Sequence, residues 1–414
     1  MRNILLTALL TVLFFIGTKN SCFAQMEITD GRSTPEYWLD RNADGDEIIL
    51  SAEEISELNA KILERDKYSA DLANYPEKIN AKTLRAKISK LTDDVHLQGT
   101  DAVMANRNLK AVKDVEVRYA VTLERVNVRL LPQAFSGDKY DSVQGTALDP
   151  AEAVAVLWTS KDGKFVFVQA RNYFGWVDKN QVAFTDRVTW LRYVQPENFV
   201  VVTNNKKFVN VGGKVVRFQM GAVIPLVDDT FENNGWTAYL PVSVNGELRE
   251  VTPKVLNDGN VNLGWLDCTA NNFVRQGFKF LGDVYGWGGL DNSVDCSAFV
   301  SDVYRSMGIN IPRDADKQEG AMPIFAVFNN VTHDERVDIA NRAPTGALFF
   351  KPGHVMMKLG NDDDGETIMI HAASSYFSDG YKIYVRKVLV SDLSYEGTAG
   401  VSTIDTLTGI AIAK

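Results

Sequence analysis

Cysteine and histidine are both scarce in this sequence. The chain of 414 residues contains three cysteines, Cys22, Cys268 and Cys296, and four histidines. So few cysteines exclude a disulfide-built scaffold and a zinc site with four thiolate ligands. Four histidines argue against histidine-rich metal chemistry, so we expect no bound metal and no other cofactor.

Positive charge is also in deficit. Lysine and arginine number 44 against 53 acidic residues, which gives a formal net charge of -9. This balance argues against binding to nucleic acid or to an anionic membrane surface. The composition that remains, 45% hydrophobic and 23% charged, is typical of a soluble globular protein, and the length predicts two to four domains.

An apolar run near the N-terminus follows the basic residue Arg2. It is too short to span a bilayer, and the small residues around Ala24 suit signal peptidase. We therefore expect residues 1–24 to be a cleaved signal peptide, which leaves a mature chain without a membrane segment in the periplasm or outside the cell. An uncleaved anchor is the alternative. Acylation of Cys22 is disfavoured because polar residues precede it.

The residues after the leader change in pattern twice. Residues 25–115 are mostly helical in pattern, with a capping box from Ser51 to Glu54. Residues 116–190 and 191–268 instead contain short alternating apolar runs separated by turns. These runs predict two small β-barrels in tandem.

Each of the two expected barrels ends in a Gly-Trp-aliphatic run, Gly175 to Val177 and Gly264 to Leu266, which we interpret as strands. Residues 269–414 change again, with helices first and strands after Ala347. This order predicts an α+β domain.

Cys296 begins an apolar helical stripe in this last domain, with Asp295 as the expected cap and Gly308 after the end. Unpaired N–H groups and the dipole at a helix N-terminus favour a thiolate, which predicts a thiol pKa lowered from about 8.5 toward 7 or below. The alternative is that Cys296 is a small buried hydrophobic residue.

Two histidines lie on either side of a strong turn, Asp362 to Asp364, which we interpret as solvated. A hairpin folded about Asp363 places His354 opposite position 371 or 372, within reach of His371. A catalytic base needs a third polar group to hold its second ring nitrogen, and His371 can be that group. The pattern therefore predicts a cysteine nucleophile with a histidine base.

A zinc site built from the same cysteine and two histidines is the competing interpretation. The spacing lacks the short ligand pairs usual in zinc sites, so we disfavour it. His96 and His333 lie in polar stretches that suggest no role.

These motifs resemble the NlpC-type cell-wall peptidases, a family of papain-like cysteine peptidases. The resemblance covers residues 270–414 and is carried by five motifs in family order: Tyr285-Gly286-Trp287-Gly288-Gly289, Asp295-Cys296-Ser297, Pro312-Arg313-Asp314, Gly353-His354-Val355 and His371-Ala372. It implies Cys296 as nucleophile, His354 as base and His371 as the residue that orients it. Ala298 and Ala347 depart from the residues usual in the family.

The upstream architecture resembles one branch of that family, the γ-D-glutamyl-diamino-acid endopeptidases with a helical N-terminal segment and two bacterial SH3-like barrels. The resemblance implies domains at 25–115, 116–190, 191–268 and 269–414, the last a papain-like α+β catalytic domain. In that branch a barrel reaches over the cleft and helps to hold the free amino end of L-Ala-γ-D-Glu-diamino acid. The implied substrate-binding residues are Asp295, Ser297, Tyr285, Trp287, Tyr173 and, more weakly, Glu152.

The expected activity is thus hydrolysis of the bond between D-Glu and the diamino acid in peptidoglycan peptides, by a monomer. Two other functions stay open: a non-catalytic peptidoglycan-binding protein, and an amidase or acyltransferase on the same scaffold. A disulfide between Cys268 and Cys296 would block the nucleophile, so we expect both thiols to be free.

Overall fold

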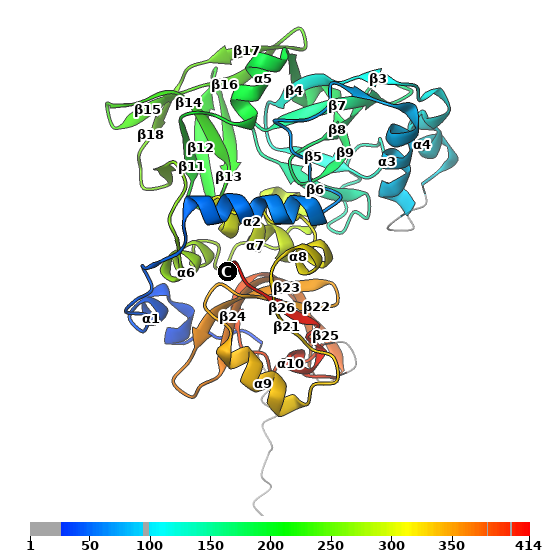
Figure 1. The fold of residues 1–414 in the computed structure, drawn as a ribbon. Helices are drawn as coiled ribbons and strands as arrows, with labels where there is room; N and C mark the ends of the chain where they lie inside the picture. Colours follow the sequence, from blue (N-terminus) through cyan, green and yellow to red (C-terminus); the bar gives the residue numbers. More distant parts are fainter. Residues whose placement is uncertain (1–25, 94–98, 379, 398–399) are drawn as a thin grey trace, which may run out of the picture.

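A computed structural model describes residues 26–93, 99–378, 380–397 and 400–414 (Figure 1). The expected signal peptide with Cys22, and His96, lie outside these residues. In the part of the chain that the structure describes, no helix is long and apolar enough to cross a membrane. The signal peptide and export therefore stay predictions.

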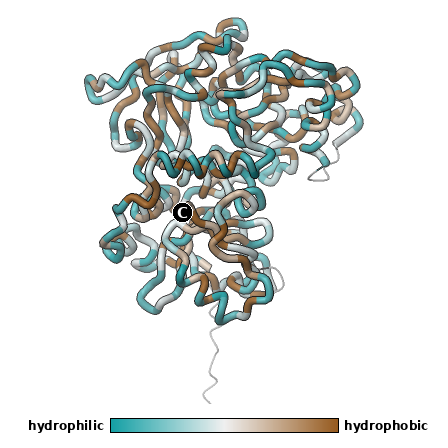
Figure 2. Tube along the Cα trace, viewed as in Figure 1, coloured by the Kyte–Doolittle hydropathy of each residue, from teal (hydrophilic) through white to brown (hydrophobic). Residues whose placement is uncertain are grey.

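The described chain forms two bodies that meet along helix α2 (Ala52–Arg65). One body contains the β-rich residues that follow the N-terminal helices, and the other contains the C-terminal α+β region (Figure 1). Figure 2 shows hydrophobic residues concentrated along the strands of both bodies and hydrophilic residues on the outer loops. The site must therefore be sought where the two bodies meet.

Short helices and strands make up residues 26–116. The elements are η1 (Gly31–Ser33), α1 (Pro35–Leu39), β1 (Ile48–Leu50), α2, β2 (Lys78–Ile79), α3 (Ala81–Asp93), α4 (Asp101–Asn106), η2 (Leu109–Ala111) and β3 (Val115–Glu116). The expected capping box of α2 is confirmed, because Ser51 Oγ accepts from the N–H of Glu54 and the Glu54 carboxylate accepts from the N–H of Ser51.

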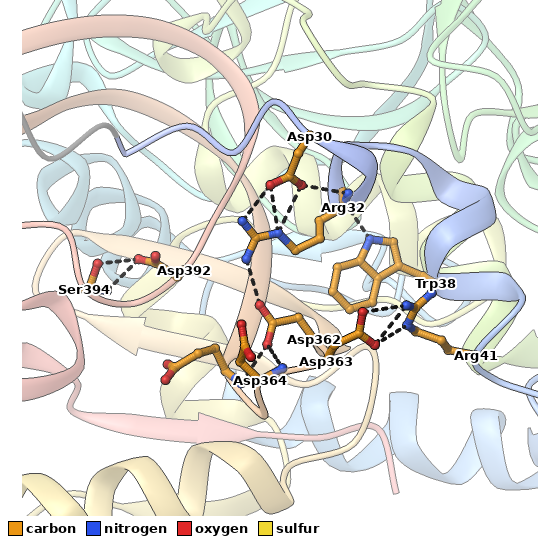
Figure 3. A network of polar contacts seen from close by, with 10 residues as sticks. Asp30, Arg32, Trp38, Arg41, Asp362, Asp363, Asp364, Asp392 and Ser394 are labelled. Atoms are coloured by element: carbon orange, nitrogen blue, oxygen red, sulfur yellow. Dashed lines mark hydrogen bonds and ion pairs between the residues drawn. The ribbon is translucent and has the colours of Figure 1, made fainter. Parts of the chain in front are cut away.

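The start of this segment is tied to the turn that we expected to be solvated. Arg32 donates to Asp362 at 2.7 Å and Arg41 to Asp363 at 2.9 Å (Figure 3). The Asp362 side chain is only 4% exposed, so for this residue the expectation of a solvated turn is wrong. Because the turn joins the two strands that carry His354 and His371, the N-terminal segment holds the tip of the histidine hairpin.

The first β-rich unit belongs to a nine-stranded sheet of order β16-β17-β10-β4-β7-β8-β9-β5-β6. Its own elements are β4 (Arg118–Thr122), β5 (Val126–Arg129), β6 (Gln144–Leu148), β7 (Ala153–Thr159), β8 (Phe165–Gln169), β9 (Phe174–Asp178), η3 (Lys179–Gln181), β10 (Val182–Thr185) and α5 (Arg187–Val194). The expected strand at Gly175 to Val177 is confirmed as part of β9, and Trp176 is fully buried.

The second β-rich unit is less separate than we expected. Its elements are β11 (Phe199–Val202), β12 (Lys206–Val211), β13 (Lys214–Gln219), β14 (Val223–Glu232), β15 (Gly235–Ala238), β16 (Leu240–Val244), β17 (Glu247–Val251), β18 (Lys254–Leu256) and β19 (Val261–Leu263). Five of these strands form a sheet of order β18-β15-β14-β11-β19, whereas β17 pairs with β10 and joins the sheet of the first unit.

One expected strand of this unit is wrong. The strand ends at Leu263, before the expected run from Gly264 to Leu266. The Trp265 ring instead packs against Phe199, with ring centroids 4.9 Å apart, and against Gly308. Packing against the C-terminal body therefore overrides the similarity to the Gly-Trp-aliphatic run of the first unit.

The C-terminal body is a six-stranded antiparallel sheet between helices, in the order β21-β26-β22-β23-β24-β25. Its elements are β20 (Cys268–Thr269), α6 (Ala270–Phe278), η4 (Trp287–Asn292), α7 (Cys296–Ser306), α8 (Ala315–Ala321), β21 (Ile324–Val327), α9 (His333–Arg342), β22 (Leu348–Lys351), β23 (His354–Asn361), β24 (Thr367–Ser378), β25 (Tyr381–Ser391), α10 (Thr403–Thr406) and β26 (Gly409–Ala411).

Helix α7 is the central element of this body. Its apolar residues Phe299, Val300 and Val303 are fully buried in one core with residues of β23 and β24. Burying three such side chains contributes about 5 kcal/mol or more of hydrophobic stabilisation. The start of α7, and so Cys296, is thereby fixed against the strands that carry the two histidines.

Candidate active site

Cys296 is the first residue of α7, as the sequence predicted. Asp295 caps the helix by accepting from the N–H of Ala298 at 2.9 Å. The backbone N–H groups of Val355 and Ser297 act on the Cys296 thiol and lower its pKa. The thiol therefore lies next to the strand residue that follows His354. Cys268 and Cys296 are both unpaired, which confirms the expectation of two free thiols.

The expected low pKa of this thiol is wrong. Burial raises the pKa of Cys296 to about 12, and the Asp295 charge adds to the rise, while the two N–H contacts lower it. Burial also lowers the pKa of His354 to about 3, with a smaller effect from the Lys351 charge. Desolvation thus outweighs the helix N-terminus. These shifts favour a neutral thiol and a neutral imidazole at neutral pH.

This resting state predicts the pH dependence of alkylation. Because the pKa of Cys296 is raised, its thiolate fraction grows with pH throughout the neutral and alkaline range. Iodoacetamide should therefore modify Cys296 slowly at pH 7 and continue to accelerate up to pH 10. Cys296→Ala protein provides the background from Cys268, and mass spectrometry gives the rate. A rate that levels off near pH 7 would contradict this and restore the thiolate expectation.

The two histidines meet, although not in the expected register. The pairs nearest to them are Met357 with Ile370 and Lys358 with Met369, so His354 lies diagonally from His371 rather than opposite it. The difference arises because the pair Asn361 and Thr367 centres the turn on position 364 rather than 363, and the shift between Lys358 and Gly360 corrects it by only one residue. His354 Nε2 and His371 Nδ1 are nevertheless 2.7 Å apart.

A third residue, which the sequence did not indicate, completes this chain of contacts. His371 Nε2 lies 3.0 Å from Ser391 Oγ, and both residues are fully buried. If His354 Nδ1 is to accept the thiol proton, Nε2 of the same ring must carry a hydrogen and donate it to His371 Nδ1. His371 Nε2 then donates to Ser391. Because the ring nitrogens of the histidines bond to each other, they are not free to share a metal ion.

Asp295 is engaged in a buried ion pair, which revises its expected role in holding the substrate amine. Arg313 binds both of its carboxylate oxygens, at 3.0 and 2.7 Å, and also donates to Ser297 Oγ at 2.9 Å. Arg313 Nε donates to Thr146 of the first β-rich unit at 2.7 Å. Although burial opposes it, the paired Arg313 charge keeps the pKa of Asp295 below its usual value. Asp295 and Ser297 thus fasten the nucleophile helix to the other body.

Cys296 lines a cleft of about 550 Å³ between the two bodies. Of the other expected residues, the cleft is also lined by Asp295, Ser297, Tyr285, Trp287 and Tyr173. Trp287 is 41% exposed, so it is not a core residue. The loop after β5 also reaches the C-terminal body, because Tyr140 and Ser374 share a hydroxyl hydrogen bond at 2.7 Å.

A carboxylate in the cleft was missed by the sequence analysis. Asp314 precedes α8, but its side chain does not cap the helix. With the other described residues, the Asp314 carboxylate makes no hydrogen bond or ion pair. Burial raises the pKa of Asp314 to about 6, Asp295 adds to the rise, and Arg313 opposes it. Burial is the largest cause that raises the pKa of Tyr173, and the Asp314 charge is the second largest. Only the position of Asp314 after Arg313 in the motif could have drawn attention to it.

The expectation for Glu152 is wrong. Its carboxylate pairs with Arg305 of α7 at 2.7 Å, and Glu152 is not among the residues that line the cleft. The Arg305 charge and hydrogen bond, against the opposing effect of burial, lower the pKa of Glu152. Glu152 is therefore part of the junction between the two bodies and lies outside the cleft lining.

A thiol at a helix N-terminus, beside an imidazole on a neighbouring sheet that a second buried side chain orients, is the arrangement of cysteine peptidases. The family comparison agrees. The NlpC/P60 family model matches residues 282–391, and the model for an SH3 domain of the SH3b1 type matches residues 131–178. The protein therefore carries an NlpC/P60 domain, from a family of cell-wall peptidases, together with an SH3b domain.

Curated relatives share part of this architecture. A γ-D-glutamyl-L-lysine dipeptidyl-peptidase of Bacillus subtilis strain 168 is 29% identical over 179 residues, which is 40% of this chain and 55% of the relative. A protein of the same name from Bacillus cereus is 27% identical over 158 residues, 35% of this chain and 43% of the relative. The chain thus spans about half the length of the curated relatives it matches.

Two solved structures share the fold. An NlpC/P60 endopeptidase from Photobacterium damselae subsp. piscicida superposes with a TM-score of 0.73 at 16% identity, covering 94% of this chain and 98% of that one. An NlpC/P60 family protein from Bacillus cereus superposes with a TM-score of 0.51 at 17% identity, covering 71% of this chain and 99% of that one. At such identities the likeness concerns the fold alone.

Proposed function

We propose that this protein hydrolyses the bond between the side-chain carbonyl of D-Glu and a diamino acid in peptidoglycan peptides with a free N-terminal L-Ala. The observation that carries this is the cleft itself, which is lined by Cys296, by Gly353 next to His354, and by Asp314 together with Tyr173 of the SH3b domain. The curated relatives bear the name of this activity.

The reaction begins when the Cys296 sulfur attacks the carbonyl carbon and His354 Nδ1 takes the thiol proton. His371 stabilises the imidazolium through Nε2 of His354. The N–H of Cys296, at the first position of α7, lacks an intrahelical partner and donates to the oxyanion. His354 then gives its proton to the departing amine, a thioester remains, and water activated by His354 releases L-Ala-D-Glu.

The free amino end of the substrate fits Asp314 better than Asp295. Both oxygens of Asp295 are already bound by Arg313, whereas the Asp314 carboxylate has no partner in the described chain. An ammonium group at Asp314 would gain a charge-assisted bond in a partly buried place. Tyr173 of the SH3b domain and Tyr285 would form the apolar wall around the alanine methyl group.

Digestion of the defined peptide L-Ala-γ-D-Glu-L-Lys tests the proposal. We expect L-Ala-D-Glu and free L-Lys as products, and in ¹⁸O-water one labelled oxygen in the dipeptide. Binding without turnover would favour a non-catalytic wall-binding protein, and an acyl product without label would favour an acyltransferase. Either result would overturn the proposal. Export by the expected signal peptide would bring the enzyme to such peptides in the periplasm or outside the cell.

A further inference from the structure

Lys351 is a partly buried cation and is one of the residues that line the cleft. Its ammonium group donates to Thr403 Oγ1 at 3.0 Å and lies 4.5 Å from the ring centroid of Tyr395. Among the described residues no carboxylate forms an ion pair with it. Burial lowers the pKa of Lys351 to about 8, so the group is still mostly charged at neutral pH. A cation held in this way is ready to accept an anion from outside the chain.

The position of Lys351 relative to the reacting groups is set by the sheet. Lys351 ends β22 and pairs directly with His354 at the start of β23. Directly opposed residues project to the same face of an antiparallel pair, so the two side chains are neighbours. The residues from Lys351 to Gly353 line the same cleft as Cys296. Lys351 is therefore beside the histidine that must deliver a proton to the departing amine.

The departing diamino acid brings a carboxylate to this place. In the proposed reaction, the amine that leaves is attached to the α-carbon of the diamino acid, and that same carbon bears its α-carboxyl group. When His354 protonates the nitrogen, the carboxyl group is thus two bonds away. The other carboxylate nearby, on the α-carbon of D-Glu, belongs to the acyl half and is separated from the scissile carbonyl by two methylene groups.

We propose that Lys351 binds the free α-carboxylate of the departing diamino acid, so that the enzyme selects tripeptides that end at this residue. This inference rests on the proposed function. In longer stem peptides the same carboxyl group is joined in a peptide bond and has no charge. Their neutral carbonyl would leave the partly buried Lys351 ammonium without a charged partner, which penalises binding.

The test compares L-Ala-γ-D-Glu-L-Lys with its C-terminal amide. We expect the wild-type protein to cleave the free acid about tenfold more efficiently in kcat/KM, the usual worth of one hydrogen bond to a charged group. Lys351→Met should lower kcat/KM for the free acid by about tenfold and for the amide by less than about threefold. Lys351→Arg should keep the preference. Lys382→Met, on the outer part of β25, is the matched control and should change neither value.

The outcomes are separable. Equal rates for acid and amide with the wild-type protein overturn this inference without any variant, and leave the proposed function intact. Equal losses for both peptides in Lys351→Met also overturn it and assign Lys351 a structural role. A third peptide carries an amide in place of the α-carboxylate of D-Glu. If the loss of kcat/KM caused by Lys351→Met disappears with this peptide and not with the C-terminal amide, Lys351 binds the D-Glu carboxylate and not that of the diamino acid. Cleavage of neither peptide by the wild type rejects the proposed function itself.

Discussion

Cys296→Ala should abolish release of L-Lys from L-Ala-γ-D-Glu-L-Lys, with kcat/KM reduced on the order of 10⁴-fold or more. Without the sulfur no thioester can form, and the histidine pair has no proton to accept. The substitution removes a single atom from the start of a helix whose cap is on Asp295 and whose apolar face lies further along the chain. We therefore expect the folded structure and peptide binding to persist.

The measurement is amine release by liquid chromatography, alongside thermal unfolding and binding of the uncleaved tripeptide. Cys268→Ala is the matched control. Cys268 is equally free and buried, but it pairs with Leu50 in a two-stranded sheet away from the cleft. Full activity in Cys268→Ala together with none in Cys296→Ala assigns the chemistry to one thiol. Release of L-Lys by Cys296→Ala would show that another group attacks the bond.

The sequence predicted the positions of Cys296, His354 and His371 well because these positions depend on local rules. A cap, an apolar stripe and a closing glycine place Cys296 at a helix start, and a turn between two apolar strands brings His354 near His371. Even there the register was wrong, because the turn is centred on position 364 rather than 363 and an irregularity between Lys358 and Gly360 then changes the pairing by one residue. Such irregularities depend on packing of the whole sheet and leave little trace in the local pattern.

Charge and burial could not be predicted in the same way. The thiol pKa depends on how far the two bodies exclude water from Cys296, which no local pattern encodes. The pairing of Asp295 with Arg313 and of Glu152 with Arg305 joins residues far apart in the chain, so the sequence could not show which carboxylates are already occupied. Asp314 was overlooked for the same reason.

Removal of the substrate's amino group should cause the second large loss of activity. Propionyl-γ-D-Glu-L-Lys has the shape of the tripeptide but lacks the ammonium group of L-Ala. Truncating one member of a buried charge pair costs about 2–5 kcal/mol, so kcat/KM should fall on the order of 10²- to 10³-fold. Asp314→Asn should impose a loss of similar size on the natural peptide, chiefly in KM, and little further loss on the propionyl analogue.

The pH dependence makes this prediction specific to Asp314. Because the pKa of Asp314 is raised to about 6, its carboxylate becomes neutral as the pH falls through that value, and KM for the natural peptide should rise. Asp314→Asn should remove this acidic limb, whereas Asp316→Asn, whose carboxylate is 70% exposed and paired with Lys317, should retain it. Equal cleavage of the natural peptide and its propionyl analogue would show that the cleft does not recognise the N-terminal ammonium group of the substrate.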